Sequence, residues 1–171
     1  MSCYEDLCFD TLNYLGIASV RQYRIPQVKK RSYDFGFLLD EQCYIIEIDG
    51  EQHFKDINHW KSCKSEQHIN DCMKQISALI LGFKVIRIHY KDIGNIMHHI
   101  KDALLILHNT DKYVYYSSPI NYEWIADIYL TCVMTNAGHI RKNYIKRYIK
   151  KRYVLDVMNV IPSKRNILLN M

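Results

Sequence analysis

The sequence predicts an α/β fold, with elements in the order α-β-β-β-α-β over residues 2–90. Short segments that are almost entirely apolar are typical of strands in a buried sheet. Longer segments repeat apolar residues three and four positions apart, which is typical of helices with one buried face. The chain has 171 residues, of which 49% are hydrophobic and 24% charged, so it can form one core, with or without an appendage.

The first helix is expected over residues 3–15. Ser2 is placed to cap it, and Glu5 three positions later completes a capping box. Gly16 is suited to end the helix. A short strand at residues 20–23 follows.

Two longer strands are expected at residues 32–38 and 43–48, joined by a tight turn over residues 39–42. Glycine at position 50 ends the second of them and allows the following residues to fold back over its end. Three basic residues form a turn before the first: Lys29, Lys30 and Arg31. Residues 54–64 have no regular pattern and are expected to form a loop.

A second helix is expected over residues 65–81, because its apolar residues are spaced three and four apart. Asp71 and Lys74 lie three positions apart and therefore share a neighbouring face of this helix. Gly82 ends the helix, and a strand is expected at residues 84–88.

Beyond residue 90 the pattern changes. A helix at residues 93–108, a strand at 112–117 and a helix at 122–136 are expected. We therefore expect a core domain over residues 1–108 and a mainly helical, basic extension over residues 109–171.

Positive charge is concentrated near the C-terminus. From residue 139 onward there are nine Lys and Arg against one acid, whereas the whole chain carries +5, so the rest is net acidic. A basic helix with interspersed tyrosines can follow a phosphate backbone, although it can also be a solvated face. The expected nucleic-acid-binding residues are the basic turn at 29–31 together with Arg141, Lys142, Lys146, Arg147, Lys150, Lys151 and Arg152.

Three acids interrupt the two apolar strands: Asp34, Glu47 and Asp49. Burying an ionised carboxylate is costly unless a cation compensates it. Residues two apart share a face of a strand, so Glu47 and Asp49 point the same way, and antiparallel pairing would bring Asp34 close to Glu47. The acids therefore predict a site for Mg²⁺ or Mn²⁺, with a solvent-facing polar stripe as the alternative.

Five segments follow one another in compact order over residues 2–90: Glu5, Asp34-Phe35, Glu47-Ile48-Asp49-Gly50-Glu51-Gln52-His53, Asp71-Cys72-Met73-Lys74 and Gly82-Phe83-Lys84-Val85-Ile86-Arg87. Together they resemble the PD-(D/E)xK restriction-endonuclease-like superfamily. Within it, they are most similar to the branch of very-short-patch-repair-like endonucleases and their phage and viral relatives. The resemblance implies a restriction-endonuclease-like core, with a central mixed sheet flanked by helices.

The resemblance also implies roles for individual residues. Asp34, Glu47 and Asp49 would be the metal ligands, and Asp49 stands where the superfamily has a strand lysine. His53 would be a general base or leaving-group acid, because the pKa of histidine lies near neutral pH. Lys74 would stabilise charge on the phosphate, and either it or His53 would take over the role of the missing lysine.

Glu5 and Asp71 are expected in supporting roles, although Glu5 also suits a helix cap and Asp71 also suits simple pairing with Lys74. His53 could equally be an ordinary loop histidine. The implied activity is Mg²⁺-dependent hydrolysis of phosphodiester bonds by an endonuclease, with DNA as the expected partner and RNA as the other candidate. The alternative is an inactive nuclease fold that binds nucleic acid or protein, for example as a viral host-interaction factor.

Six cysteines occur without a C-x-x-C pair, which favours reduced thiols in a cytoplasmic or nuclear setting, here of a virus-infected host cell. No apolar run reaches the roughly 18 residues typical of a membrane span, and no signal-peptide pattern opens the sequence, so no membrane partner is expected.

Overall fold

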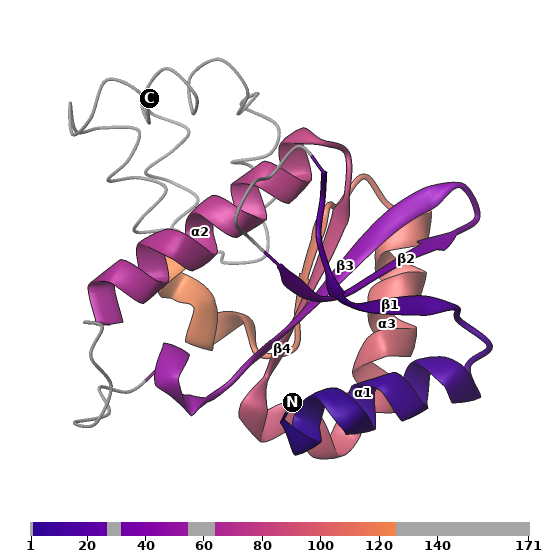
Figure 1. Ribbon diagram of the computed structural model, residues 1–171, viewed down its shortest axis with the longest axis horizontal. Helices are drawn as coiled ribbons and strands as arrows, with labels where there is room; N and C mark the ends of the chain where they lie inside the picture. Colours follow the sequence, from indigo (N-terminus) through magenta and orange to yellow (C-terminus); the bar gives the residue numbers. More distant parts are fainter. Residues whose placement is uncertain (1, 27–31, 55–63, 126–171) are drawn as a thin grey trace.

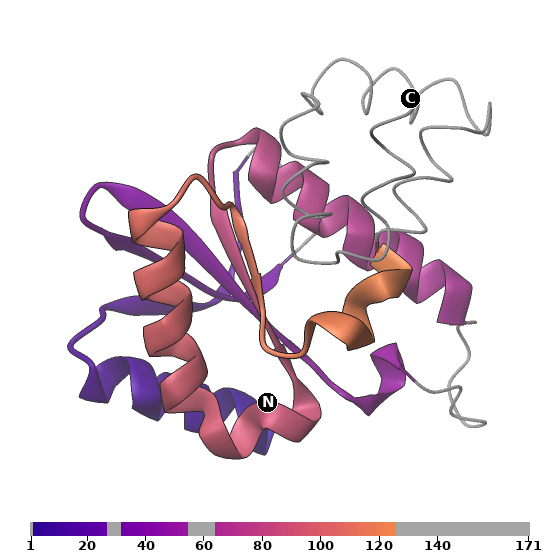
Figure 2. The same cartoon turned by 180° about the vertical axis from the view of Figure 1, so that it is seen from behind.

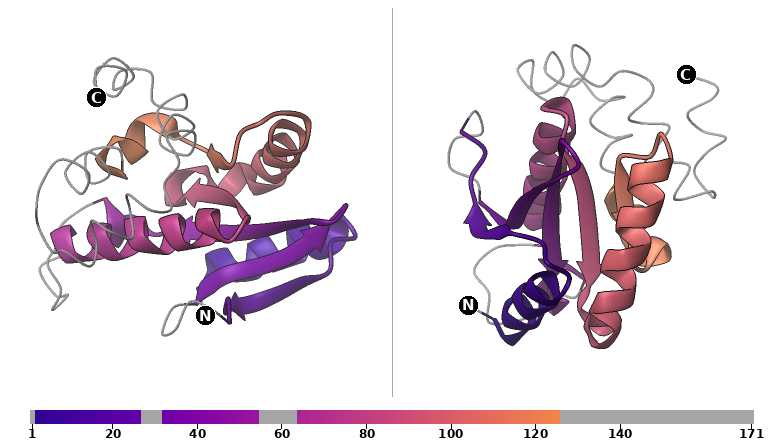
Figure 3. Two further views of the ribbon diagram at one scale, coloured as in Figure 1. Left: turned by 90° about the horizontal axis from the view of Figure 1, so that it is seen from above. Right: turned by 90° about the vertical axis from the view of Figure 1, so that its right-hand side faces the viewer.

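The computed structural model describes residues 2–26, 32–54 and 64–125 (Figure 1). The fold is α/β, with a five-stranded mixed sheet in the order β1-β2-β3-β4-β5. Helices α1 (Cys3–Tyr14) and α3 (Ile96–Asn109) pack on one face of the sheet, and α2 (Lys64–Ile80) packs on the other (Figures 2 and 3). Among these described helices, none is long and apolar enough to span a membrane.

The first three strands form an antiparallel meander, and the last two are added in parallel. Parallel neighbours need long crossover connections, which α2 and α3 supply. The strands are β1 (Ser19–Tyr23), β2 (Tyr33–Leu39), β3 (Gln42–Asp49), β4 (Lys84–His89) and β5 (Val114–Tyr116), and the 3-10 helices are η1 (Glu51–His53), η2 (Tyr90–Asn95) and η3 (Pro119–Tyr122).

The expected α-β-β-β-α-β order is confirmed, and each of its elements lies within two residues of its expected bounds. The capping box is present, because the Ser2 hydroxyl accepts from the Glu5 amide and the Glu5 side chain accepts from the Ser2 amide. The turn between β2 and β3 is also present, with Asp40 and Glu41 at φ values of 47° and 62°. Positive φ at both central residues is the geometry of a two-residue hairpin loop.

The expectations beyond residue 90 need correction. Residues Tyr90–Asn95 form a 3-10 helix, so α3 begins at Ile96 rather than at residue 93. The strand expected at 112–117 is reduced to Val114–Tyr116 and pairs with β4, so the sheet continues past the boundary expected at residue 108. Residues 123–125 are helical, and the rest of the expected basic extension lies outside the described residues.

The core has two layers, one on each side of the sheet. Strands β3 and β4 are apolar on both faces because helices cover both. On β3, Ile45 packs toward α2, whereas Tyr44 and Ile46 pack toward α1 and α3. Glu47 and Asp49 are therefore unusual in β3, because both faces of this strand otherwise pack against apolar side chains.

Gly36 in β2 is held against the ring of Tyr23. A Cβ at this position would lie 2.3 Å from the nearest ring carbon. We expect Gly36→Ala to lower the free energy of unfolding by about 1–3 kcal/mol, because the added methyl overpacks the β1–β2 contact. Urea unfolding measures this effect, with Gly94→Ala as the matched control, since a Cβ at Gly94 would have no atom within 4 Å. Equal losses in the two variants would contradict the packing explanation.

Candidate active site

Strands β2 and β3 separate at Asp34. Their antiparallel register pairs Phe35 with Ile46, which places Asp34 opposite Glu47, as expected. Beyond Phe35 the main-chain pairing stops, and the Asp34 carboxylate accepts a hydrogen bond from the amide of Ile48 at 2.7 Å. The side chain thus satisfies a backbone donor that the departing strand leaves unpaired. A cleft lies where these two interior strands separate.

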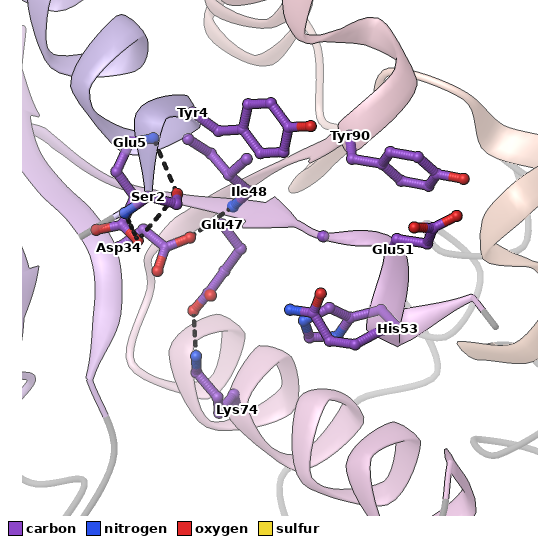
Figure 4. A pocket seen from close by; sticks show the side chains of 12 residues that line it. Ser2, Tyr4, Glu5, Asp34, Glu47, Ile48, Glu51, His53, Lys74 and Tyr90 are labelled. Carbon is purple, nitrogen blue, oxygen red and sulfur yellow. Dashed lines mark hydrogen bonds and ion pairs between the residues drawn. The ribbon is translucent and has the colours of Figure 1, made fainter. Parts of the chain in front are cut away.

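The cleft has a volume of about 490 Å³ (Figure 4). It is lined by the first turn of α1, the ends of β2 and β3, η1, the middle of α2 and the start of η2. Five of the residues expected in the site line it: Glu5, Asp34, Glu47, His53 and Lys74. The other two, Asp49 and Asp71, do not.

Lys74 reaches the cleft from α2. Its position is fixed by Tyr33, whose hydroxyl donates to the main-chain carbonyl of Lys74 at 2.9 Å. The Lys74 ammonium nitrogen lies 2.7 Å from Oε1 of Glu47. At this distance the ammonium can also donate a hydrogen bond, and the charge and the hydrogen bond of Lys74 both act to lower the pKa of Glu47. Lys74 therefore compensates the charge of Glu47, and this one cation leaves part of the acceptor capacity of the carboxylate unused.

Two of the acids that line the cleft, Asp34 and Glu47, hold their protons unusually tightly. Burial raises the pKa of Glu47 to about 8, against the attraction of Lys74 and with the help of the charge of Asp34. Burial also raises the pKa of Asp34 to about 6, although the hydrogen bond from Ile48 acts in the other direction. Near neutral pH, a cation entering the cleft would compete with a proton for Glu47.

His53 is carried into the cleft by η1, which turns back after β3. A Cβ at Gly50 would lie 2.4 Å from the side-chain oxygen of Gln52, so a larger residue there would require the flexible Gln52 side chain to move. Nδ1 of His53 lies 2.6 Å from Oδ2 of Asp71. Nδ1 is therefore engaged with Asp71, and Nε2 is the ring nitrogen left for chemistry.

The two partners of this contact shift each other's pKa. Burial acts to lower the pKa of His53, but the hydrogen bond to Asp71 and the charges of Asp49 and Asp71 outweigh it and raise the pKa. Burial acts to raise the pKa of Asp71, but the hydrogen bond to His53 and the charge of Arg87 outweigh it and lower the pKa. Asp71 is thus an orienting partner of His53, and it is not paired with Lys74 as the helix spacing had suggested.

The placement of Asp49 corrects its expected role as a metal ligand. Its carboxylate is bound by both nitrogens of one edge of the Arg87 guanidinium, with Nε donating to Oδ2 at 2.8 Å. The Tyr122 hydroxyl donates to the same Oδ2 at 2.9 Å. Asp49 and Arg87 are 1% and 2% exposed. Asp49 is therefore a buried counter-ion for Arg87, and the cleft keeps two of the three expected metal ligands.

Arg87 and Tyr122 were not expected from the sequence as partners of Asp49. Arg87 stands in an otherwise apolar strand, and a cation there implies a buried acid nearby. That signal was available, but it does not say which acid. Tyr122 offered no comparable signal, because a tyrosine near an apolar segment is ordinary.

Glu5 is both a capping residue of α1 and a lining residue of the cleft. Its Oε2 accepts from the Gln22 side chain at 3.3 Å. In the part of the chain that the structure describes, no three His, Cys, Asp or Glu side chains are grouped closely enough to hold a metal ion. Two carboxylates, Asp34 and Glu47, nevertheless suit Mg²⁺, which takes carboxylate ligands and keeps several waters in its shell.

The expected nucleic-acid-binding residues lie outside the described residues, both in the turn at 29–31 and in the stretch at 141–152. Comparisons of the chain with models of protein families, with curated proteins and with solved structures find no match.

The raised pKa values of Glu47 and Asp34 predict how stability depends on pH. Both acids bind protons more tightly in the folded state, so their contribution is fully present below the ordinary carboxyl pKa and is lost as pH rises through about 6 and about 8. We expect the free energy of unfolding to fall between about pH 4 and about pH 8. Glu47→Gln should flatten this dependence in urea unfolding series, and Glu41→Gln, at the exposed hairpin turn, should leave it unchanged.

Proposed function

We propose that this chain is a metal-dependent endonuclease with a restriction-endonuclease-like core that hydrolyses phosphodiester bonds in DNA. One observation carries the proposal. Asp34 and Glu47 lie opposite each other on neighbouring strands and line one cleft, with Lys74 in contact with Glu47. Buried acids with raised pKa values, beside a cation in a cleft, are typical of functional sites.

The two acids would hold Mg²⁺ or Mn²⁺ through Oδ1 or Oδ2 of Asp34 and the carboxylate of Glu47. The ion, when bound, supplies a positive charge that polarises the phosphate and offsets the charge that develops on its oxygens. The Asp49 carboxylate already binds the Arg87 guanidinium, so we do not propose it as a third metal ligand.

Lys74 is the proposed replacement for the missing strand lysine. Its ammonium group reaches the same acid from α2, and a metal bound to Glu47 would free it to contact a phosphate oxygen. His53 is the proposed base: Nε2 would take a proton from the attacking water while Asp71 stabilises the resulting imidazolium. The water oxygen would bond to phosphorus as the P–O bond to the leaving group breaks, and the leaving oxygen would take a proton from a solvent water.

The experiment compares digestion of single-stranded DNA, duplex DNA and RNA by the purified protein, with Mg²⁺, Mn²⁺ or a chelator. Cleavage of DNA that requires the metal is the expected result. Binding of DNA without any cleavage would favour the alternative of an inactive nuclease fold. Equal decay of all three substrates in the presence of the chelator would contradict the proposal.

The basic residues near the C-terminus are proposed to supply DNA affinity. Each phosphate contact contributes roughly −0.9 to the slope of log affinity against log salt concentration on duplex DNA. We expect replacement of Arg141, Lys142 and Lys146 by glutamine to reduce this slope by about 2–3. Replacement of Arg24, Lys101 and Lys112 by glutamine is the charge-matched control, since none of the three lines the cleft. Equal slopes in both triple variants would contradict the assignment.

A further inference from the structure

One wall of the cleft is aromatic. Tyr4 of α1 and Tyr90 of η2 line the cleft together with Asp34, Glu47 and Lys74. Figure 4 shows both rings on the side away from Lys74, beyond β3. Ile48 lines the cleft beside Tyr4, so this wall is largely apolar. Lys74 and Glu47 lie on the opposite side, and Glu51 lies between Tyr90 and His53.

The Tyr90 ring is held in place by its neighbours. Its centroid lies 4.6 Å from that of His89 and 6.1 Å from that of Phe54, and the Lys91 ammonium lies 5.9 Å from the ring centre. Tyr4 lies in the first turn of α1, which the capping box fixes. Both tyrosines are half-buried. The Tyr90 ring is therefore ordered before any ligand arrives, which lowers the entropy cost of binding, and the Tyr4 side chain starts from a backbone that the cap holds in place.

Hydrolysis of a phosphodiester does not itself require an aromatic wall, because the phosphate and its sugars are polar. Tyrosine faces do suit nucleobases, which stack on aromatic side chains in proteins that bind single strands. In a duplex the faces of each base are covered by its neighbours. A base can therefore reach Tyr4 or Tyr90 only if its nucleotide is unpaired and leaves the stack.

We infer that the cleft takes DNA whose nucleotides beside the scissile phosphate are unpaired, as in a single strand, a flap or a frayed end. One base would stack on Tyr4 or Tyr90 while its phosphate faces Asp34 and Glu47. The cleft volume of about 490 Å³ is within the range of pockets that enclose one small ligand. This inference rests on the proposed function and specifies its substrate class.

The test measures binding by fluorescence anisotropy with a chelator present, so that cleavage plays no part. The full-length protein is titrated with a labelled single strand, the same sequence as a duplex, and a fully abasic strand of equal length. The variants are Tyr4→Leu and Tyr90→Leu, with Tyr4→Phe and Tyr90→Phe to retain the ring. Tyr14→Leu is the control, because Tyr14 ends the same helix and is 77% exposed outside the cleft.

We expect each leucine variant to bind the single strand roughly tenfold more weakly, which corresponds to one lost stacking contact. Binding of the duplex and of the abasic strand should not change, and the phenylalanine variants should bind within about twofold of the unaltered protein. Melting curves establish whether the variants are folded. If a leucine variant does not fold, the phenylalanine variants still report on the tyrosine rings.

Two results would overturn the inference. One is an equal loss of affinity for the single strand and the abasic strand, and the other is an equal effect of leucine and phenylalanine. The proposed function is scored separately, by metal-dependent cleavage. Cleavage that persists, without any preference that depends on the rings, would remove the inference and leave the nuclease. Single-strand binding that depends on the rings, without cleavage under any metal, would remove the proposed nuclease activity and leave a cleft that binds unpaired bases.

Discussion

Asp34→Asn and Glu47→Gln are each expected to lower the rate of Mg²⁺-dependent DNA cleavage by about 10²–10³-fold. Each change removes one charged oxygen ligand and keeps the size of the side chain. The DNA affinity should stay within a few-fold, because the basic residues expected to bind DNA lie elsewhere in the chain. Single-turnover cleavage and anisotropy titrations measure the two effects separately.

Asp40→Asn and Glu41→Gln are the matched controls, since these acids are exposed in the turn of the same hairpin and do not line the cleft. They should cleave at the unaltered rate. If they lost activity as severely as the cleft variants, the loss would reflect net charge or hairpin stability. If the cleft variants kept full activity, Asp34 and Glu47 would not be the catalytic acids.

Arg87→Met is expected to destabilise the fold by about 3–5 kcal/mol, because it leaves Asp49 as a buried charge without its cation. For a chain of this size the melting temperature should fall by roughly 10 °C. The effect is large since both partners are almost fully buried and the guanidinium binds the carboxylate through two nitrogens. Thermal and urea unfolding measure it.

An exposed ion pair on the same protein provides the comparison. Arg21 lies 2.7 Å from Asp6, but the two side chains are 25% and 58% exposed. Arg21→Met should cost about 0–1 kcal/mol. The double variant Arg87→Met with Asp49→Leu should recover part of the loss, because it removes both buried charges. Equal costs for Arg87→Met and Arg21→Met would contradict the assignment of Asp49 as the buried counter-ion.

The same contact explains why Asp49 cannot be exchanged for the lysine that the superfamily pattern has at this position. Asp49→Lys would set an ammonium group against the guanidinium of Arg87, both away from water. We expect this variant to be largely unfolded. The proposed mechanism therefore assigns the lysine role to Lys74, whose ammonium reaches Glu47 from α2.

Local signals made much of the fold predictable. The capping box at Ser2 and Glu5 and the turn at Asp40 and Glu41 involve residues a few positions apart, so the sequence shows them directly. The alternation along β2 and β3, with one acid opposite another, also follows from short-range periodicity and antiparallel pairing.

Contacts between distant segments were not predictable in the same way. Asp49 lies 38 positions from Arg87 and 73 from Tyr122, and a periodic pattern carries no information about which partner closes such a distance. The pairing of β5 with β4 was not predicted for the same reason. A strand-like composition shows that a segment forms a strand, but not which strand it pairs with. Asp49 was expected beside Glu47 because the two residues share a face of β3. Residues on one face of a strand need not line the same cleft, and Asp49 does not line this one.

Calorimetric titration of Mn²⁺ into the full-length protein near pH 7 measures whether Asp34 and Glu47 bind a metal ion. We expect binding that is lost in Asp34→Asn and Glu47→Gln and kept in Asp40→Asn. It also predicts proton release on binding, visible as a dependence on buffer ionisation enthalpy, because the pKa of Glu47 is about 8. Mn²⁺ binding that is unchanged in both cleft variants would contradict the claim that these two acids form a metal site.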